Sequence, residues 1–238
     1  DGDLARDGHF WYTDQSAMFI GRFDTKTATF KEWAVPGTTK TPAGVSDIVI
    51  DPEGFVWLPA TSDLANSTFG MITRFDPRTE TFEPVKNMPR TASTQFLGLD
   101  GNGKLWSGFG PWFKIDRKTN TFEESFNLRT APNKPADASG GGYQMEVDSS
   151  GNPVLTDAGS GYIAKMNGAT KEIRWIKVSV KDSYPRRGRM DKEDRFWFSM
   201  YRGNKVGMLD PKTDAVREYP LPYNYFAPYT VSYPDARG

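Results

Sequence analysis

The octet FDTKTATF, residues 23–30, is the first of five similar stretches that decide the fold of this chain. The others read FDPRTETF at 75–82, IDRKTNTF at 115–122, MNGATKEI at 166–173 and LDPKTDAV at 209–216. Spacings of 52, 40, 51 and 43 residues separate the first residues of the turns, which stand second in each octet: Asp24, Asp76, Asp116, Asn167 and Asp210. Self-similarity at a period of about 40–50 residues is typical of propeller blades and helical arrays. The chain is therefore expected to be a repeat protein.

A second marker, an Asp-led tight turn followed by an aromatic strand, falls between the octets. The turns are DPEG at 51–54, DGNG at 100–103, DSSG at 148–151, DKED at 191–194 and DARG at 235–238. The strands after them are FVWLPA at 55–60, KLWSGF at 104–109, NPVLTD at 152–157 and RFWFSM at 195–200, and HFWYTD at 9–14 is similar. Asp and Gly favour such turns because Asp bonds its own backbone and Gly tolerates positive φ.

Each repeat contains four short segments with strand character. In the unit that contains the second octet, DIVID at 47–51 is a nearly continuous apolar run, as expected for a strand buried on both faces. VWLPA follows the turn, and GMITRF at 70–75 and TFEPV at 81–85 alternate between apolar and polar residues, which indicates half-buried outer strands. No segment shows a persuasive helical period. The repeat is therefore expected to be a four-stranded antiparallel sheet.

The predicted fold is an all-β propeller of four-stranded antiparallel blades, with five repeats in a single domain, 1–238. The repeats run approximately over 9–54, 55–103, 104–151, 152–194 and 195–238. Blade-to-blade packing is expected from Trp11, Trp57, Trp106 and Trp197. A closed five-bladed ring, in which the first strand completes the last blade, and a piece of a six- or seven-bladed chain both remain open. The alternative is a flat sandwich with coincidental turns.

Composition excludes several classes of function. The chain has 30 basic and 30 acidic side chains, whereas a protein for nucleic acid or an anionic membrane normally carries a basic excess. No apolar run approaches the length of about 20 residues that a membrane helix needs. Cysteine is absent, which excludes disulfides, thiolate zinc sites and a cysteine nucleophile. We therefore expect neither nucleic-acid binding nor membrane insertion.

The repeat unit resembles that of a known family. Trp11-Tyr12-Thr13-Asp14 is followed by Ile20-Gly21-Arg22-Phe23-Asp24 and Glu32-Trp33, and Trp197-Phe198-Ser199 is followed by Val206-Gly207-Met208-Leu209-Asp210 and Glu218-Tyr219-Pro220. This pattern resembles the virginiamycin B lyase (streptogramin lyase) family of β-propellers and, more distantly, gluconolactonase-like and NHL-type propellers. The resemblance covers all five repeats, but the matching residues are those that build blades.

The resemblance implies a magnesium-dependent lyase that opens a cyclic depsipeptide by elimination, with histidines and a glutamate at a central site. This chain has one histidine, His9, in DGHFW, where the other repeats place Phe55, Lys104, Asn152 or Arg195. His9 is therefore expected to be a variable turn residue. The catalytic residues stay unknown, no metal ligands are predicted, and Mg²⁺ is implied by the resemblance alone.

Candidate ligand-binding residues lie in irregular loops, which carry function on a rigid scaffold. Tyr184-Pro185-Arg186-Arg187-Gly188-Arg189 places three arginines in a loop that leads into a first strand, and arginines bind carboxylate or phosphate bidentately. The predicted ligand-binding residues are Arg186, Arg187, Arg189, Tyr201, Arg202, Trp112, Tyr143 and Tyr229, the last three as stacking surface. The alternative is that the arginines pair with acids such as Asp182 and Asp137 on a solvated rim.

The predicted function is a ligand- or partner-binding module that uses its loop face to hold a small anionic ligand or another protein. A periplasmic or secreted location is expected. One alternative is a divalent-cation-dependent lyase or hydrolase of a cyclic ester or lactone. A second alternative is a structural or sensor domain of a larger extracytoplasmic protein.

Overall fold

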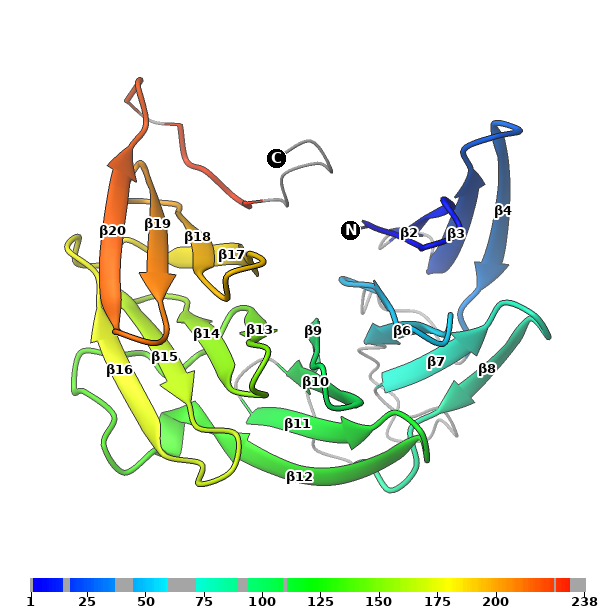
Figure 1. The fold of residues 1–238 in the computed structure, drawn as a ribbon, viewed down its shortest axis with the longest axis horizontal. Helices are drawn as coiled ribbons and strands as arrows, with labels where there is room; N and C mark the ends of the chain where they lie inside the picture. Colours follow the sequence, from blue (N-terminus) through cyan, green and yellow to red (C-terminus); the bar gives the residue numbers. More distant parts are fainter. Residues whose placement is uncertain are drawn as a thin grey trace. The chain divides into compact units, whose positions relative to one another are not determined.

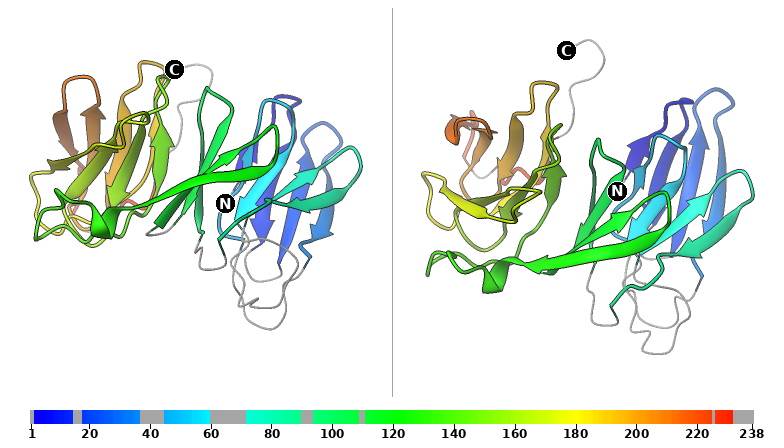
Figure 2. Two further views of the ribbon diagram at one scale, coloured as in Figure 1. Left: turned by 90° about the horizontal axis from the view of Figure 1, so that it is seen from below. Right: turned by 60° about the horizontal axis from the view of Figure 1, so that its bottom comes forward.

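The computed structural model describes residues 2–14, 18–36, 45–59, 72–89, 94–108, 111–224 and 226–231. Within these residues the chain forms twenty β-strands and one short 3-10 helix, η1 (Leu128–Thr130). The strands make five antiparallel sheets of four, and the strands of each sheet follow one another in chain order (Figure 1, Figure 2). The all-β class and the five four-stranded blades predicted from the sequence are confirmed.

The chain divides into two compact units, and unit 1 (Asp1–Leu99 with Gly103–Phe126) holds the first three sheets. The first sheet contains β1 (Gly2–Leu4), β2 (Phe10–Asp14), β3 (Phe19–Asp24) and β4 (Thr29–Ala34). The second contains β5 (Val49–Ile50), β6 (Val56–Pro59), β7 (Ile72–Asp76) and β8 (Thr81–Pro84). The third contains β9 (Phe96–Leu99), β10 (Lys104–Gly108), β11 (Pro111–Asp116) and β12 (Thr121–Asn127).

Unit 2 (Asp100–Asn102 with Asn127–Gly238) holds the last two sheets. One contains β13 (Met145–Val147), β14 (Pro153–Asp157), β15 (Tyr162–Met166) and β16 (Ile173–Lys177). The other contains β17 (Pro185–Met190), β18 (Phe196–Met200), β19 (Lys205–Asp210) and β20 (Ala215–Pro220). The two sheets contact each other through β17, which packs against β13 and β14.

The five octets form the turns between the third and fourth strands of the sheets. The fifth residue after the first letter of each octet has a left-handed backbone, with φ of 54° at Ala28, 57° at Glu80, 54° at Asn120, 64° at Lys171 and 60° at Asp214. The Ala28 N–H donates to the Asp24 carbonyl at 2.9 Å, and the Asp24 carboxylate accepts from the Lys26 N–H at 2.8 Å. The repeated octet therefore encodes one turn geometry, used five times.

Burial follows the order of the strands within a sheet. The second strands β6 and β14 are buried along their whole length, whereas the fourth strands β4 and β20 are largely exposed. In unit 1, Trp11 contacts Phe75 of the next sheet with ring centroids 6.0 Å apart, and Trp57 packs in a cluster with Leu97 and Leu105. Neighbouring sheets within a unit therefore cover each other's apolar faces, as propeller blades do.

The strand HFWYTD at the start of the chain contributes β2, which pairs with β1 and β3. Among the described residues it completes the first sheet, so the strand exchange with the last blade is not observed. Each sheet begins one strand before the aromatic strand, and the repeat boundaries drawn from the sequence stay a prediction. The turn DARG at 235–238 and the loops at 37–44 and 60–71 lie outside the described residues.

Helices contribute almost nothing to the architecture. In the part of the chain that the structure describes, no helix is long and apolar enough to cross a membrane.

Candidate functional site

Arg186 and Arg187 lie in a β-bulge of β17, the first strand of the last sheet. The pairing of β17 with β18 shifts between Pro185 and Gly188, where β17 carries one residue more than its partner. A bulge bends its strand and redirects side chains, and bulges often occur beside functional sites. The bulge therefore gives the two arginines orientations that a regular strand would not.

A side-chain amide fixes the backbone directly after the bulge. Gln144 is 2% exposed, and its Nε2 donates to the Gly188 carbonyl at 3.2 Å while its Oε1 accepts from the Gly188 N–H at 3.2 Å. A Cβ on residue 188 would lie 2.2 Å from the Trp197 carbonyl oxygen. Position 188 therefore requires glycine, and Gln144 holds it from the neighbouring sheet.

The residue before the bulge has an unusual backbone. Tyr184 has a φ of 55°, which is an outlier for a bulky residue and persists only where the surroundings impose it. Its N–H donates to the Ser160 carbonyl at 3.3 Å, and its own carbonyl accepts from the Tyr201 N–H at 3.3 Å. These contacts tie the turn to two neighbouring loops and place the Tyr184 ring beside Arg186.

Four tyrosine rings surround the guanidinium of Arg186. The guanidinium carbon lies 5.2, 4.9, 4.3 and 4.4 Å from the ring centroids of Tyr143, Tyr184, Tyr201 and Tyr229, respectively. These distances are within the range of cation–π attraction, which is about 6 Å. We call these four residues the tyrosine cage.

The tyrosine cage is continuous. Ring centroids of consecutive members lie 6.5 Å apart for Tyr143 and Tyr184, 6.3 Å for Tyr184 and Tyr201, and 6.2 Å for Tyr201 and Tyr229. The hydroxyl oxygens of Tyr143 and Tyr229 lie 2.6 Å apart. The four residues come from four different segments of unit 2, so the fold, and not the local sequence, assembles the cage.

The Tyr143 hydroxyl is held in its neutral form. Burial raises the pKa of Tyr143 to about 12, and the hydrogen bond with Tyr229 adds to the increase, whereas Arg186 and Arg187 oppose it. At neutral pH the Tyr143 phenol therefore carries its proton. A pair of phenols uses one O–H in the shared hydrogen bond, which leaves the second O–H able to donate elsewhere.

The Arg186 side chain is half-buried within the tyrosine cage. Among the described residues it makes no hydrogen bond and no ion pair, and its Nε is buried. The alternative predicted from the sequence, pairing with Asp182 or Asp137, is not observed for Arg186 among the described residues. The Asp137 carboxylate instead accepts from Lys177 at 2.9 Å and from the Tyr162 hydroxyl at 2.8 Å. A guanidinium offers five N–H donors, and aromatic faces cannot accept them as an anion would.

The structure brings together most of the residues that the sequence singled out. The guanidinium carbon of Arg187 lies 5.8 Å from the Tyr229 ring centroid, and that of the exposed Arg202 lies 4.9 Å from the Tyr184 ring centroid. Arg189 instead pairs with Glu146 at 2.8 Å, and burial raises the pKa of Glu146 although Arg189 lowers it.

Trp112 is placed differently from the other predicted site residues. It belongs to β11 of unit 1 and is 0% exposed. As the structure stands, it presents no ring face to solvent on which a ligand could stack. Its predicted contact with a ligand stays a prediction.

Sequence reasoning missed two residues of this site. Tyr184 belongs to the loop that the sequence singled out, but its role as a cage wall depends on a positive φ that no pattern indicated. Gln144 precedes β13 and has no motif of its own; its role depends on the bulge at Gly188. The signal that could have revealed the bulge is the glycine in Arg187-Gly188-Arg189, because an isolated glycine in a strand often marks a bulge.

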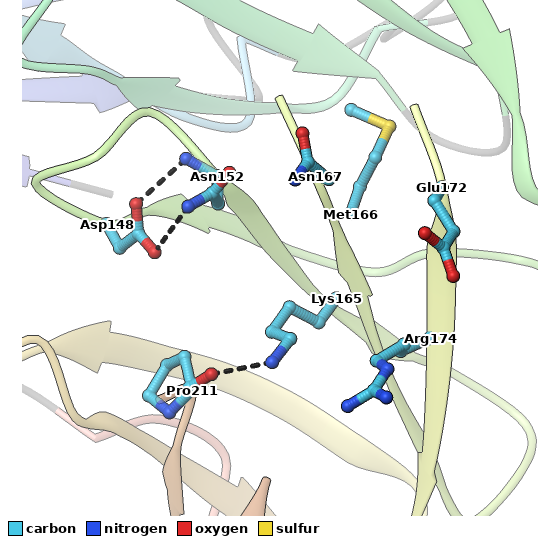
Figure 3. A pocket seen from close by; sticks show the side chains of 8 residues that line it. All are labelled: Asp148, Asn152, Lys165, Met166, Asn167, Glu172, Arg174 and Pro211. Carbon is cyan, nitrogen blue, oxygen red and sulfur yellow. Dashed lines mark hydrogen bonds between the residues drawn. The ribbon is translucent and has the colours of Figure 1, made fainter. Parts of the chain in front are cut away.

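A polar pocket of about 370 Å³ lies elsewhere in unit 2 and is drawn in Figure 3. Lys165 Nζ donates to the Pro211 carbonyl at 2.6 Å, and both Lys165 and Arg174 pair with Asp214. The Asp148 carboxylate accepts from the backbone and side chain of Asn152. Because these groups already bind one another, the pocket is a weaker candidate than Arg186.

In the part of the chain that the structure describes, His9 and the acidic residues do not form the metal site that the resemblance implies. His9 pairs with Asp7 at 2.9 Å and lies 3.5 Å from Asp24, at a turn of the first sheet. Among the described residues, no three His, Cys, Asp or Glu side chains are grouped so as to hold a metal ion. These residues therefore do not fit a histidine–glutamate magnesium centre.

Comparison with known proteins supports the fold. No protein-family model and no curated protein sequence matches the chain. Virginiamycin B lyase from Staphylococcus aureus superposes with a TM-score of 0.77 at 18% identity, over 96% of this chain and 72% of that one. Its catalytically inactive variant with quinupristin gives 0.77 at 19% identity, over 97% and 72%. The extracellular domain of BT4673 from B. thetaiotaomicron, described as a one-component system, gives 0.69 at 17%, over 94% and 31%. At these identities the likeness shows the fold alone, and the predicted propeller resemblance is confirmed at that level.

Proposed function

We propose that the chain is a periplasmic or secreted ligand-binding propeller whose last sheet holds a small anionic ligand through Arg186. One observation carries this proposal: a guanidinium enclosed by four tyrosines that makes no hydrogen bond or ion pair among the described residues. Arginine binds carboxylate and phosphate through two parallel N–H···O bonds. A bound anion would supply the acceptors that the site lacks.

Energetics favour an anion over an empty site. Cation–π contacts involve the flat faces of the guanidinium and leave its N–H edges without acceptors. A half-buried charge that has lost part of its hydration is costly until an opposite charge and hydrogen bonds compensate it. Hydrogen bonds to charged groups contribute about 1.5–3 kcal/mol each. The ligand would therefore gain more at Arg186 than at the exposed Arg202.

The scaffold suits recognition. The bulge, the Gln144 clamp and the backbone of Tyr184 fix the arginine before any ligand arrives, and preorganisation lowers the cost of binding. The likeness to extracellular domains and to a lyase with a bound ligand supports an extracytoplasmic binding role by analogy. Because the residues present do not fit the implied magnesium centre, elimination chemistry is not part of the proposal.

Isothermal titration calorimetry of the full chain with acetate and with inorganic phosphate tests the proposal. We expect at least one of these anions to bind saturably to the wild-type chain and at least tenfold more weakly to Arg186→Gln. The matched control is Arg78→Gln in unit 1, whose exposed guanidinium pairs with Asp76 at 2.8 Å. This variant should bind the anion as the wild type does.

The variant Arg186→Lys separates the effect of the positive charge from that of the planar guanidinium. Arg186→Lys keeps the positive charge but cannot make the two parallel hydrogen bonds, so its affinity should fall between those of the wild type and Arg186→Gln. Circular dichroism melts show whether each variant folds. Equal anion affinity of folded wild type and folded Arg186→Gln, or no binding by either, contradicts the proposed function.

A further inference from the structure

We infer that the ligand at Arg186 is a monocarboxylate attached to a flat aromatic or apolar body, and not a phosphate. The inference rests on the proposed function and adds the chemical class of the ligand. Three features of the site carry it: the number of uncommitted charges, the kind of hydrogen-bonding groups, and the aromatic surface beside them.

Within the described ranges of the chain, the half-buried Arg186 makes no hydrogen bond and no ion pair. Arg189 is paired with Glu146 at 2.8 Å, and Arg187 also takes part in contacts other than that with Tyr229. Arg202 is exposed, so water and salt screen its charge. The charge of Arg186 alone can balance the single negative charge of a carboxylate. A phosphate, which carries between one and two negative charges near neutral pH, would also draw on the half-buried Arg187, which already takes part in other contacts.

The polar groups of the site are mainly donors. The guanidinium edge is planar and supplies N–H groups in a fork that matches the two coplanar oxygens of a carboxylate. Of the two phenols whose oxygens lie 2.6 Å apart, one retains an O–H for a further acceptor. A carboxylate accepts from all of these groups and brings no proton of its own. A tetrahedral phosphate would direct its remaining oxygens toward the aromatic cage, which offers them no cation.

The walls next to these donors are aromatic. Tyr229 is 46% exposed and Tyr201 is half-buried, although both rings contact the guanidinium. Their uncovered surface can pack against an apolar group, and aromatic pairs prefer offset or edge-to-face contact with centroids about 4.5–7 Å apart. The spacing of 6.2 Å between these two rings, at 90°, already follows this preference. A flat ring attached to the carboxylate would add a further aromatic contact of this kind.

Three probes separate the possibilities: benzoate, acetate and inorganic phosphate, titrated into the full chain at one ionic strength and pH 7. We expect benzoate to bind about tenfold more tightly than acetate and acetate to bind no more weakly than phosphate, because the ring adds buried apolar area. Arg186→Gln should weaken benzoate at least tenfold. Tyr229→Leu should weaken benzoate by a larger factor than acetate, because only benzoate loses the packing of its ring against Tyr229.

The outcomes distinguish the inferred class of ligand from the proposed anion-binding function. Phosphate binding as tightly as benzoate, with both dependent on Arg186, overturns the inference and leaves the proposed function intact. Acetate binding as tightly as benzoate likewise removes the aromatic body from the inference. Failure of all three probes to bind in an Arg186-dependent manner overturns both. N-acetyl-phenylalaninate, as a fourth probe, identifies the source: tighter binding than benzoate supports the carboxyl terminus of a peptide, and weaker binding supports a free aromatic acid.

Discussion

The hydroxyl oxygens of Tyr143 and Tyr229 lie 2.6 Å apart although the two residues are 86 positions apart in sequence. Tyr229 is also anchored through its backbone, because the Ser199 hydroxyl donates to its carbonyl at 2.9 Å. The contact joins the segment that follows the last sheet to the loop that leads into β13. It closes the tyrosine cage around Arg186 and therefore links the stability of the site to that of unit 2.

The phenol pair should be measurable as a coupling energy. Tyr229→Phe and Tyr143→Phe each remove the shared hydrogen bond, and each should lower the free energy of unfolding by about 1–2 kcal/mol. The double variant should cost less than the sum of the two, with a coupling of about 1 kcal/mol. Urea unfolding of the four proteins provides the cycle. Strictly additive effects would show that the pair does not stabilise the cage.

Stability should fall at alkaline pH. The folded-state pKa of Tyr143 and that of Tyr12 are both raised to about 12, first by burial and then by hydrogen bonds to Tyr229 and Glu32, whereas tyrosine in an unfolded chain has a pKa of about 10. The unfolded chain therefore releases these protons first as pH rises. The stabilisation is complete below pH 10 and is lost as pH rises toward 12.

Urea midpoints at pH 9 and pH 11 check this alkaline dependence. Tyr143→Phe and Tyr12→Phe should each make the fall between the two pH values smaller than in the wild type, and combining them should reduce it further. Lysines also titrate in this range, so the comparison between variants carries the test. If both variants lose as much stability as the wild type between pH 9 and pH 11, the assignment is wrong.

The Asp-led turns should stabilise the tryptophans that follow them. The Trp57 Nε1 donates to Asp51 at 2.7 Å, and the Trp197 Nε1 donates to Asp191 at 2.7 Å, six residues apart in both cases. Trp57 is 0% exposed, whereas Trp197 is half-buried. Asp51→Ala should lower the free energy of unfolding by about 2–3 kcal/mol, and Asp191→Ala by less, since water can reach the Trp197 indole. Urea unfolding followed by tryptophan fluorescence measures both, and an equal or larger cost for Asp191→Ala would contradict this view.

Part of the fold could be predicted because the turns and strands of the repeat depend on residues that are close together in the sequence. Asp24 and Asp76 bond their own turns, and Trp11 and Trp57 follow strand patterns, so the five repeats and their strand order could be inferred. The candidate site could be predicted only in part. Arg186, Tyr143 and Tyr229 were identifiable as residue types in irregular segments. Their convergence depends on a bulge, a glutamine clamp and a left-handed tyrosine, which are products of tertiary packing.

One repeated feature of the turns was also missed. Ala28 occupies a left-handed backbone position with φ of 54°, at which glycine is normally favoured. No glycine stands at this place in any of the five octets, so the left-handed backbone was not predicted. The Asp side chain and the backbone hydrogen bond of the turn impose the conformation instead.

Ala28→Gly should therefore stabilise the chain. A left-handed conformation costs an L-residue about 1–2 kcal/mol, and replacement by glycine removes this cost. The larger backbone entropy of glycine in the unfolded chain offsets part of the gain. We therefore expect an increase of about 0.5–1 kcal/mol in the free energy of unfolding. The matched variant Asn120→Gly should destabilise, because the Asn120 Nδ2 donates to the Pro84 carbonyl at 3.0 Å. Thermal melts of both variants compare the two turns, and a lower melting temperature for Ala28→Gly would refute the reasoning.

Arginine side-chain NMR tests the central claim, anion binding at Arg186, most directly. Nε–Hε signals of the full chain are assigned through Arg186→Gln and Arg78→Gln and then followed during a benzoate titration. The account predicts that the Arg186 signal moves saturably, with one dissociation constant, while the Arg78 signal moves only as it does with added chloride. An Arg186 signal that does not move, or that moves no more than that of Arg78, would contradict the account.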